Sequence, residues 1–500
     1  MGRNNSIFEE LFIFEMANSH QGSVEHGIEI VKAMARITRK YNIKGAVKLQ
    51  YRNLDTFVHQ DFRTREDVPH IPRFMSTRLN YDQFTQLVDA IHDEGLITMC
   101  TPFDEDSVDW CMDQGIDIIK VASCSALDWP LLTKIALTNK PIIISTGGKT
   151  LSDIDKIYNF FTHKNCQFAF LHCVAEYPAP LDSLQLNFIE RMSRRYPDIV
   201  TGYSGHENPD DNIVPMLAIA KGAKILERHV GLPTETIKLN AYSMNPEQAD
   251  KWVKASLDAK AICTLKKDDT KYISQEEIDS LRSLMRGVYL KKEIKSGQAI
   301  SLEDVYFAMP CLENQMVSGD FTDGIKASRD YSADEALMEK KQIHEINQVR
   351  SVIHDAKGML YEAGIALGNE FEVELSHHYG MQHFRQTGAI IINIINREYC
   401  KKLLIVLPGQ KHPVHAHKLK EETFQLLYGD LSVTIEGQEK KMLPGDIQTV
   451  FRGEKHSFTS TKGAIFEEVS TTHVRNDSYY DDVRISALDP IERKTILKNW

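Results

Sequence analysis

Basic residues are scarce relative to acidic ones in this 500-residue sequence, which has 59 Lys and Arg, 70 Asp and Glu and a formal net charge of -11 at pH 7. Nucleic-acid-binding domains normally carry a basic face, so we expect no nucleic-acid partner. No apolar run approaches the roughly 20 residues of a membrane-spanning helix, and the first residues, MGRNNSIFEELF, lack the apolar core of a signal peptide. We therefore expect no membrane span, and any anionic substrate must be held by locally placed cations.

Cysteine pairs are also missing, because the cysteines are scattered and form no Cys-x-x-Cys motif. In a chain of this length that pattern is typical of reduced thiols in a cytoplasmic protein, and it argues against a disulfide framework. The cysteines are Cys100, Cys111, Cys124, Cys166, Cys173, Cys263, Cys311 and Cys400.

The first half of the chain alternates short apolar runs with amphipathic stretches such as residues 24–41 and 81–95. Runs that are apolar almost throughout are typical of parallel strands, which are buried on both faces. Eight β–α units in about 250 residues predict an α/β fold, the (β/α)8 TIM barrel, over residues 1–265. The runs are FIFEMA, GAVKLQ, LITMCTPF, IIKVAS, PIIISTG, FAFLHC, IVTGYSGH and KILERHV.

Polar residues gather where these runs end, and barrel enzymes place their chemistry at the carboxyl ends of the strands. The alternative is that the residues are merely solvated strand ends. We predict a catalytic face made of Glu15, Lys48, Thr101, Lys120, Ser123, Ser145, Thr146, His172, Ser204, His206 and His229.

Two of these residues, His206 and His229, end successive strands and are expected to face each other across the barrel mouth. Neutral imidazole binds divalent metals such as Mn²⁺ or Zn²⁺, and two ligands leave coordination positions open for a substrate oxygen. In the alternative interpretation each histidine only satisfies a hydrogen bond at the barrel rim. Glu15, at a nearby strand end, favours the metal site.

Lys48 and Lys120 are cations at the ends of apolar strands, and a buried lysine needs a partner. We predict that the partner is an anion, either a phosphate or a carboxylate. The alternative is a pair of structural salt bridges. Further hydroxyl or backbone donors to the anion would come from Thr101, Ser123, Ser145, Thr146 and Ser204.

The barrel sequence resembles the sialic acid (N-acetylneuraminate) synthase family. The matching segments are FEMANSHQG, VKLQ, TPFDEDSVDW, IKVAS, PIIISTGG, LHCVAEYPAP, GYSGHE, ILERHV and YSMNP, in that order. Residues 284–346, which read as short strands broken by Gly297 and Pro310, are similar to the antifreeze-like (SAF) domain that follows the barrel in this family. The charged stretch 264–277 is expected to be an exposed linker.

The resemblance implies a transferase that joins phosphoenolpyruvate to the open-chain aldehyde of an N-acyl hexosamine and releases phosphate, giving a nonulosonic acid. It implies that His206 and His229 hold Mn²⁺ or Mg²⁺ and that Glu15 manages the associated water or proton. Lys48 and Lys120, with the hydroxyls named above, would clamp phosphate and carboxylate. In the family an SAF arginine reaches the sugar site of a neighbouring subunit, so a homodimer is expected.

This sequence departs from the family pattern on the sugar side. Leu239 stands near the position of a family aspartate, Ser125 stands where many members have glutamate, and Met309 stands where the SAF arginine is expected. The phosphoenolpyruvate side is intact. The resemblance therefore identifies the donor and leaves the acceptor sugar open.

The last third of the chain contains both cupin motifs. The first is matched position for position by Gly409-x5-His415-x-His417-x4-Glu422-x6-Gly429. The second is matched by Gly445-x5-Phe451-x-Gly453-x2-His456, with Phe in place of the usual Pro.

The histidines and the glutamate of these motifs predict a metal site. His415 and His417 alternate on one strand and so face the same side, and Glu422 and His456 can arrive from neighbouring strands. Three imidazoles and a carboxylate suit Mn²⁺, Zn²⁺ or Fe²⁺. We predict an all-β cupin, a double-stranded β-helix, over residues 366–490, preceded by a helix around 347–366.

The segment 383–424 resembles D-lyxose isomerase-type cupins, which implies a sugar-binding metal site. Three functions stay open: a synthase with an accessory metal cupin, a bifunctional enzyme whose cupin isomerises or epimerises the sugar, and a carbohydrate-binding regulatory protein on a decayed synthase. Retention of Glu15, both lysines and both barrel histidines argues against decay.

Overall fold

The computed structural model describes residues 6–265, 271–341, 345–474, 476–498 and 500. The chain divides into two compact units, residues 1–272 and 273–500. In the described part, no helix is long and apolar enough to cross a membrane. The predicted domain limits 1–265, 284–346 and 366–490 stay predictions.

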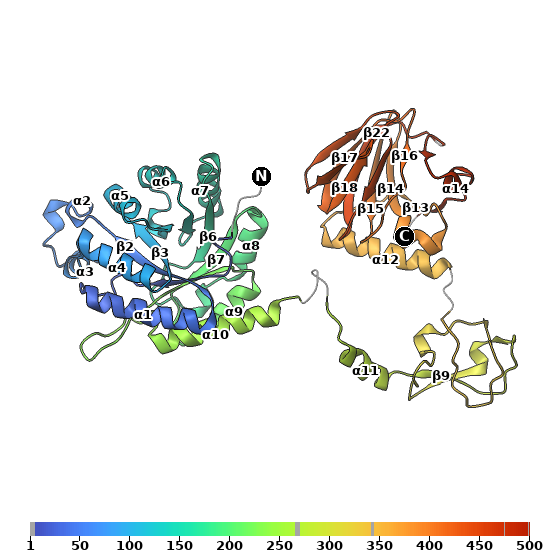
Figure 1. Ribbon diagram of the computed structural model, residues 1–500, viewed down its shortest axis with the longest axis horizontal. Coiled ribbons are helices and arrows are strands. Elements are labelled where there is room, and N and C mark those ends of the chain that lie inside the picture. Colours follow the sequence, from blue (N-terminus) through green and yellow to red (C-terminus); the bar gives the residue numbers. More distant parts are fainter. Residues whose placement is uncertain (1–5, 266–270, 342–344, 475, 499) are drawn as a thin grey trace. The chain divides into compact units, whose positions relative to one another are not determined.

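The first unit is a closed barrel of eight parallel strands in chain order, which confirms the predicted α/β fold (Figure 1). Each strand pairs with the next, and β8 closes on β1. The strands are β1 (Leu11–Glu15), β2 (Lys44–Tyr51), β3 (Ile97–Pro102), β4 (Ile118–Val121), β5 (Ile142–Ser145), β6 (Phe168–Cys173), β7 (Val200–Gly205) and β8 (Ile225–His229).

Helices surround the barrel on its outside (Figure 1). The first long helix, α1, begins after the cap Ser23, whose hydroxyl accepts from the His26 amide. It ends at Tyr41 and is followed by Asn42 in the left-handed region. The helices of this unit are α1 (Val24–Tyr41), α2 (Leu54–Phe57), α3 (Ile71–Ser76), α4 (Tyr81–Asp93), α5 (Glu105–Asp113), α6 (Trp129–Ala136), α7 (Leu151–His163), α8 (Asn187–Arg195), α9 (Ile213–Ala220) and α10 (Pro246–Cys263).

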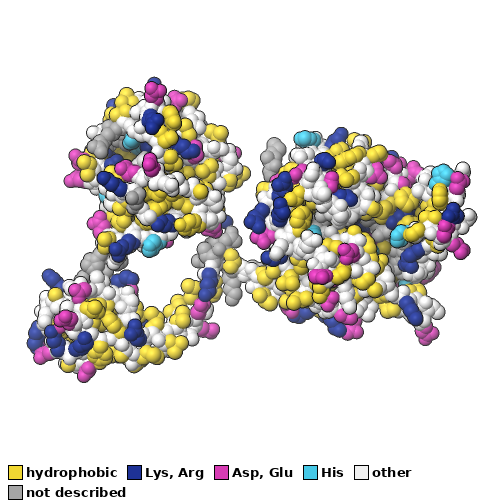
Figure 2. All heavy atoms as spheres, turned by 180° about the vertical axis from the view of Figure 1, so that it is seen from behind, with side chains coloured by type: hydrophobic (Ala, Val, Ile, Leu, Met, Phe, Trp, Pro, Cys, Tyr) yellow, Lys and Arg dark blue, Asp and Glu magenta, His cyan; other side chains and the backbone are white. Residues whose placement is uncertain are grey.

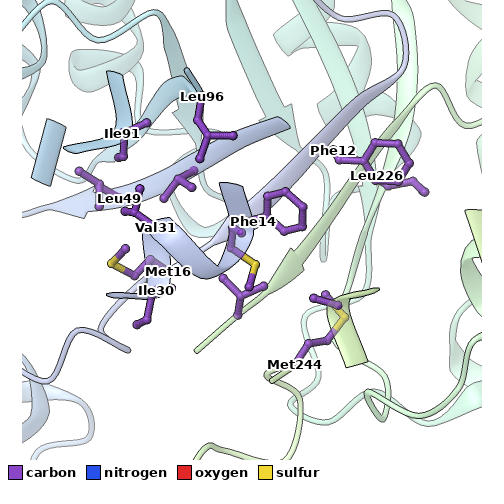
Figure 3. Close-up of a cluster of buried hydrophobic side chains, with 14 of the residues drawn as sticks. Phe12, Phe14, Met16, Ile30, Val31, Leu49, Ile91, Leu96, Leu226 and Met244 are labelled. Carbon is purple, nitrogen blue, oxygen red and sulfur yellow. The ribbon is translucent and has the colours of Figure 1, made fainter. Parts of the chain in front are cut away.

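Alternation along each strand separates two cores. Outward residues such as Phe14 and Leu49 pack against Ile30 and Val31 of α1, and Figure 3 shows this layer between strands and helices. Inward residues such as Ile13 fill the lower barrel. Side chains alternate with period two, so every second residue of a strand points into the barrel. Along the inward rows, the residues are apolar at first and become polar toward the carboxyl end of the strand.

The second unit begins with helix α11 (Gln275–Leu284), so the last residues of the predicted linker 264–277 are helical. The rest of that linker includes residues 266–270, which lie outside the described residues. Ser274 caps the helix by accepting from the Glu277 amide. A small β-rich segment follows, with strands β9 (Gly287–Leu290), β10 (Ala299–Ile300), β11 (Val305–Ala308) and β12 (Ile325–Lys326). Its assignment as an SAF domain stays a prediction.

Helix α12 (Glu345–Glu362) lies where the helix around 347–366 is predicted and ends four residues earlier than expected. Gly364, with φ of 66°, adopts the left-handed conformation that stops a helix. On the face that Figure 2 shows, acidic and basic side chains are interspersed over the surface of each part of the chain.

Two antiparallel sheets follow and confirm the predicted all-β cupin. One has the order β20-β17-β22-β15-β14-β13-β24 and the other β19-β18-β21-β16-β23. The strands are β13 (Glu372–Ser376), β14 (Ala389–Asn396), β15 (Tyr399–Val406), β16 (His415–Ala416), β17 (Glu422–Gly429), β18 (Leu431–Ile435), β19 (Gln438–Met442), β20 (Ile447–Val450), β21 (His456–Thr459), β22 (Ala464–Thr471), β23 (Tyr479–Tyr480) and β24 (Lys494–Leu497). Two short helices, α13 (Phe384–Thr387) and α14 (Val483–Ser486), lie in the connections.

Candidate active site and metal centre

The carboxyl ends of the barrel strands bring the predicted polar residues together in one buried cluster. Glu15 is the register partner of Lys48 on one side and of His229 on the other. The inward row that contains Ile13 ends in Glu15, and the row that contains Ala46 continues to Lys48. The site is therefore positioned by strand register, without a long loop.

An ion-pair network lies at the centre of this cluster. The Lys48 Nζ is 2.5 Å from Glu15 Oε2 and 2.8 Å from Glu227 Oε1. The Lys120 Nζ is 3.1 Å from the same Glu227 oxygen, and Ser204 Oγ donates to it over 2.9 Å. The structure thus contains the alternative to the anion prediction, in which carboxylates of the chain partner both lysines.

Burial and charge divide these groups into unlike pairs. Burial raises the pKa of Glu15 and Lys48 only partly opposes it, whereas Lys120 and Lys48 outweigh burial and hold the pKa of Glu227 well below its usual range. Burial lowers the pKa of Lys120, which has one carboxylate partner. Burial acts on Lys48 too, but two carboxylates outweigh it and raise its pKa.

His206 and His229 lie side by side, with ring centroids 5.4 Å apart. Burial lowers the pKa of each histidine to about 3. The charge of His229 adds to the effect on His206, and the charge of Lys48 adds to the effect on His229. The Nδ1 of His206 lies 3.0 Å from the Val174 carbonyl, which only accepts, so its hydrogen is on Nδ1 and Nε2 keeps a lone pair. Two neutral imidazoles so placed fit a divalent ion.

The predicted hydroxyls divide into free and engaged groups. Thr101 Oγ1, Ser145 Oγ and the second oxygen of Glu227, Oε2, are buried without a hydrogen-bond partner. Ser123 Oγ accepts from the Gly147 amide over 2.9 Å, and Thr146 Oγ1 donates to a backbone carbonyl over 3.1 Å. Buried polar atoms without partners are rare in folded proteins, so the free ones mark a place where a polar ligand fits.

Aromatic rings surround the histidine pair on the solvent side. Tyr177 lies 4.3 Å from His206 and Tyr242 lies 5.1 Å from His229, both between ring centroids. Of the three departures from the family pattern, Leu239 packs near Gly231, Ser125 is buried and Met309 is exposed.

The cupin contains a cluster of three buried histidines, His415, His417 and His456, whose ligand atoms lie within 4.8 Å of one another. Glu422 belongs to the same cluster, since its Oε1 is 3.4 Å from His417 Nε2 and its Oε2 is 3.1 Å from His456 Nε2. Glu422 Oε2 and His456 Nε2 are buried and have no hydrogen-bond partner. This donor set, with lone pairs left over, fits a divalent metal.

Backbone carbonyls orient all three rings. The Nδ1 atoms of His415, His417 and His456 lie 3.2, 2.7 and 3.1 Å from the carbonyls of Pro413, Asp477 and Glu454, respectively. Each Nδ1 therefore carries the hydrogen and each Nε2 presents a lone pair, the arrangement that fixes metal-binding histidines.

Charged side chains that the sequence analysis missed line the same cupin cavity. Lys420 forms ion pairs with Glu422 and, over 3.1 Å, with Glu468, and Lys402 lies 3.6 Å from Glu468. Ser470 Oγ also donates to Glu468 over 3.0 Å. The cavity thus offers a candidate acid–base pair, Lys420 and Glu468, beside the metal ligands.

A signal for some of the missed residues was present in the strand periodicity. Glu227 stands two residues before His229 and so shares its inward face, although it lies within one of the runs predicted to be apolar. Glu468 stands two residues after the buried Phe466 on β22 and is indicated in the same way, whereas Lys420 lies in the connection before β17, where strand periodicity gives no signal.

Comparison with known proteins places this geometry in a family. Residues 40–267 match the NeuB family and residues 402–469 match the cupin domain. A solved structure from Chromobacterium violaceum, assigned to spore coat polysaccharide biosynthesis, is 43% identical, covers 66% of this chain and 98% of its own, and superposes with a TM-score of 0.63. The chain belongs to the NeuB family. A cupin domain follows its NeuB domain.

Two curated relatives have lower sequence identity to this chain, and almost the whole length of each is covered by the match. The spore coat polysaccharide biosynthesis protein SpsE of Bacillus subtilis is 26% identical over 68% of this chain and 94% of its own length. The pseudaminic acid synthase of Campylobacter jejuni is 25% identical over 67% of this chain and 98% of its own. The N-acetylneuraminate-9-phosphate synthase of Mus musculus is 27% identical over 45% of this chain and 61% of its own length, which confirms the resemblance to sialic acid synthases.

Proposed function

We propose that the barrel condenses phosphoenolpyruvate with the open-chain aldehyde of an N-acyl hexosamine-type sugar, in the manner of the sialic acid synthases that it resembles. Phosphoenolpyruvate, the aldehyde and water give a nonulosonic acid and phosphate. The observation that carries the proposal is the pair of buried hydroxyls without partners, Thr101 and Ser145, which lie on strands that pair with those of Lys48 and Lys120. These groups suit the oxygens of an enol phosphate.

The chain's residues have distinct roles in this reaction. Lys48 and Lys120 bind and orient the phosphate and carboxylate, with hydroxyl donors from Thr101, Ser123 and Ser145, whereas the hydroxyls of Thr146 and Ser204 already donate within the chain. A divalent metal, Mn²⁺ or Mg²⁺, held by His206 and His229 would polarise the aldehyde oxygen. Glu15, whose pKa burial raises, is placed to take or give a proton at its Oε1 or Oε2.

The bond changes balance without a redox partner. Carbon 3 of phosphoenolpyruvate attacks the aldehyde carbon, forming the C–C bond while the aldehyde oxygen gains a proton. Water adds at carbon 2, and the phosphate leaves as that carbon becomes the ketone of the product. The strand-end cluster is buried, which keeps other water away from the reacting atoms.

For the cupin we propose a second divalent ion, Mn²⁺, Zn²⁺ or Fe²⁺, on His415, His417, Glu422 and His456. The neighbouring pair Lys420 and Glu468 favours a sugar-processing role, in which the cupin isomerises or epimerises the sugar before condensation. A regulatory or product-binding cupin, or a regulatory protein on a decayed synthase, is the competing function. We also propose that the protein is cytoplasmic, which its eight free cysteines support. The resemblance to SAF domains supports a homodimer.

The test is phosphate release from phosphoenolpyruvate with Mn²⁺ and a panel of hexosamines. His229→Ala is expected to abolish release with every sugar, whereas His415→Ala is expected to abolish it only with sugars that need prior isomerisation. Matched controls are His92→Ala, at the far end of α4, and His354→Ala, exposed on α12. Release unchanged in His229→Ala, or absent in the native chain with all sugars, contradicts the proposal.

A further inference from the structure

Arg52 is a cation at the barrel mouth that no acid of the described chain neutralises. It directly follows β2 and continues the inward row of Lys48 and Gln50. The side chain is partly buried, and its Nε has no solvent contact and no hydrogen-bond partner. Of the described carboxylates, none forms an ion pair with it, although burying an unpaired charge is costly.

Two aromatic rings fix the plane of this guanidinium. Its central carbon lies 4.2 Å from the centroid of Phe74 and 3.6 Å from that of Phe103. Gln50 Oε1 accepts from Nη2 over 3.0 Å. Stacked in this way, the group is oriented before a ligand arrives, and its Nε edge is the one that grips a carboxylate or phosphate with parallel hydrogen bonds.

The cavity around Arg52 also contains a second arginine, Arg78, which differs from Arg52 because it has a carboxylate partner. Arg52 and Arg78 both line this cavity, with Asn18 and His20. Arg78 is exposed and its guanidinium is bound by both oxygens of Asp55. Glu15 and Asp104 act on Arg52 electrostatically without forming an ion pair with it. The carboxylate of Glu15 is engaged by Lys48 and the Ala17 amide, and that of Asp104 accepts from the amides of Asn53 and Ser107. Arg52 is therefore the cation of this cavity that is available to a ligand.

The position of Arg52 points to the acceptor side of the site. It follows Lys48 by four residues, about 13 Å of extended chain, and so lies nearer the mouth than the lysines. The lysines and the free hydroxyls already meet the charges of an enol phosphate at the strand ends. A further anion at Arg52 must come from the other substrate.

We propose that Arg52 binds a carboxylate or phosphate carried by the acceptor, so that the acceptor is an acidic sugar. The inference rests on the proposed condensation only for the identity of the second substrate. The anion site itself depends on the stacked, unpaired guanidinium. Loss of this site is expected to weaken binding of an acidic sugar roughly ten- to a hundredfold, the usual worth of a charge-assisted bidentate contact.

The test compares sugar binding by calorimetry in the full-length protein with Mn²⁺ present. The ligands are N-acetylhexosamines, their 6-phosphates and the corresponding hexuronates, in the gluco, manno and galacto configurations. We expect one acidic class to bind at least tenfold more tightly than its neutral counterpart, and the class identifies phosphate or carboxylate. Arg52→Met removes this preference and leaves neutral sugars unchanged, and Arg52→Lys keeps part of it.

The matched control is Arg78→Met, which removes a neutralised arginine from the same cavity and is expected to keep the preference. The proposal is overturned if no acidic sugar is preferred, if Arg52→Met retains the preference, or if Arg52→Met weakens phosphoenolpyruvate binding instead. Should acidic sugars bind through Arg52 while no sugar supports phosphate release, the condensation fails and the anion site stands. If Arg52→Met does not fold, Arg52→Lys, which preserves the charge, is measured instead. A reduced preference for the acidic sugar then supports the proposal, and an unchanged preference overturns it.

Discussion

Glu227 is the residue on which the electrostatics of the barrel mouth depend. One of its oxygens holds Lys48, Lys120 and Ser204 at once, while the other has no partner. Glu15 is the second carboxylate on Lys48, so Glu227 is the one acid among the described ion pairs that holds Lys120.

Replacing Glu227 by Gln tests this assignment. The change leaves Lys120 without a carboxylate partner, and breaking a buried ion pair from one side costs about 3–5 kcal/mol of unfolding free energy. We expect the free energy of unfolding in urea to fall by that amount in the absence of ligands. Phosphate or phosphoenolpyruvate should restore more stability than in the native protein, because either ligand pairs the orphaned lysine.

Glu207→Gln is the matched control for this prediction. Glu207 forms an equally buried ion pair with Arg228, whose side chain faces away from the barrel interior. Its loss should destabilise the chain similarly, but anions should add no more stability than they add to the native protein. Equal rescue of both variants would show that the lysines do not form an anion site.

For single residues, the sequence predicts which of them lie at strand ends, but it does not predict which of them are in contact with one another. The rule that parallel barrels place chemistry at the carboxyl ends of the strands finds Glu15, Lys48 and His229. Contacts across the barrel depend on register between distant segments, so the ion pair between Lys120 and Glu227, which are 107 residues apart in sequence, was not foreseen. The period-two alternation of β8 indicates that Glu227 lies on the same inward face as His229.

The connection between β16 and β17 is the element on which the cupin centre depends. The carboxylate of Asp477 accepts from three consecutive backbone amides, those of Lys418, Leu419 and Lys420, at 3.0–3.2 Å. Its own carbonyl lies 2.7 Å from His417 Nδ1. One residue therefore fixes both the loop and the orientation of a metal ligand.

Asp477→Ala is expected to loosen this loop and weaken ion binding by the cupin about 10–100-fold, the usual effect of removing a group that orients a ligand. The measurement is a competition titration with a chelating indicator. Asp481→Ala is the control, since Asp481 is exposed and paired with Lys455. Ion affinity that is equal in the two variants would show that the loop does not position His417.

Elements differ in how far local sequence determines them. Each barrel strand is an apolar run between helices, so all eight were predicted. Strand β16 has two residues and pairs with β21 and β23 through His415, so it exists by long-range pairing. Helix α11 begins inside the predicted linker, because high charge does not by itself indicate an exposed connection and Ser274 is a helix cap.

At the scale of the whole molecule, the two candidate ion-binding centres lie in two separate compact units. The barrel offers two imidazoles and the cupin three imidazoles and a carboxylate. A centre with more ligands holds its ion more tightly, and the cupin set, with imidazole in the majority, prefers later first-row metals. The two centres should therefore lose their ions at different chelator concentrations.

We expect the native chain to bind two divalent ions, measured by elemental analysis after equilibrium dialysis, and each centre to be emptied independently. His229→Ala should leave one ion and abolish phosphate release. The double variant His415→Ala/His417→Ala should also leave one ion, but it should keep release with any acceptor that the barrel accepts directly. Because the ligand sets belong to different units, mild chelation should remove the barrel ion first, and added Mn²⁺ should restore release without refilling the cupin. If either variant lost both ions, the centres would be one coupled site, and the assignment of synthase chemistry to the barrel alone would be wrong.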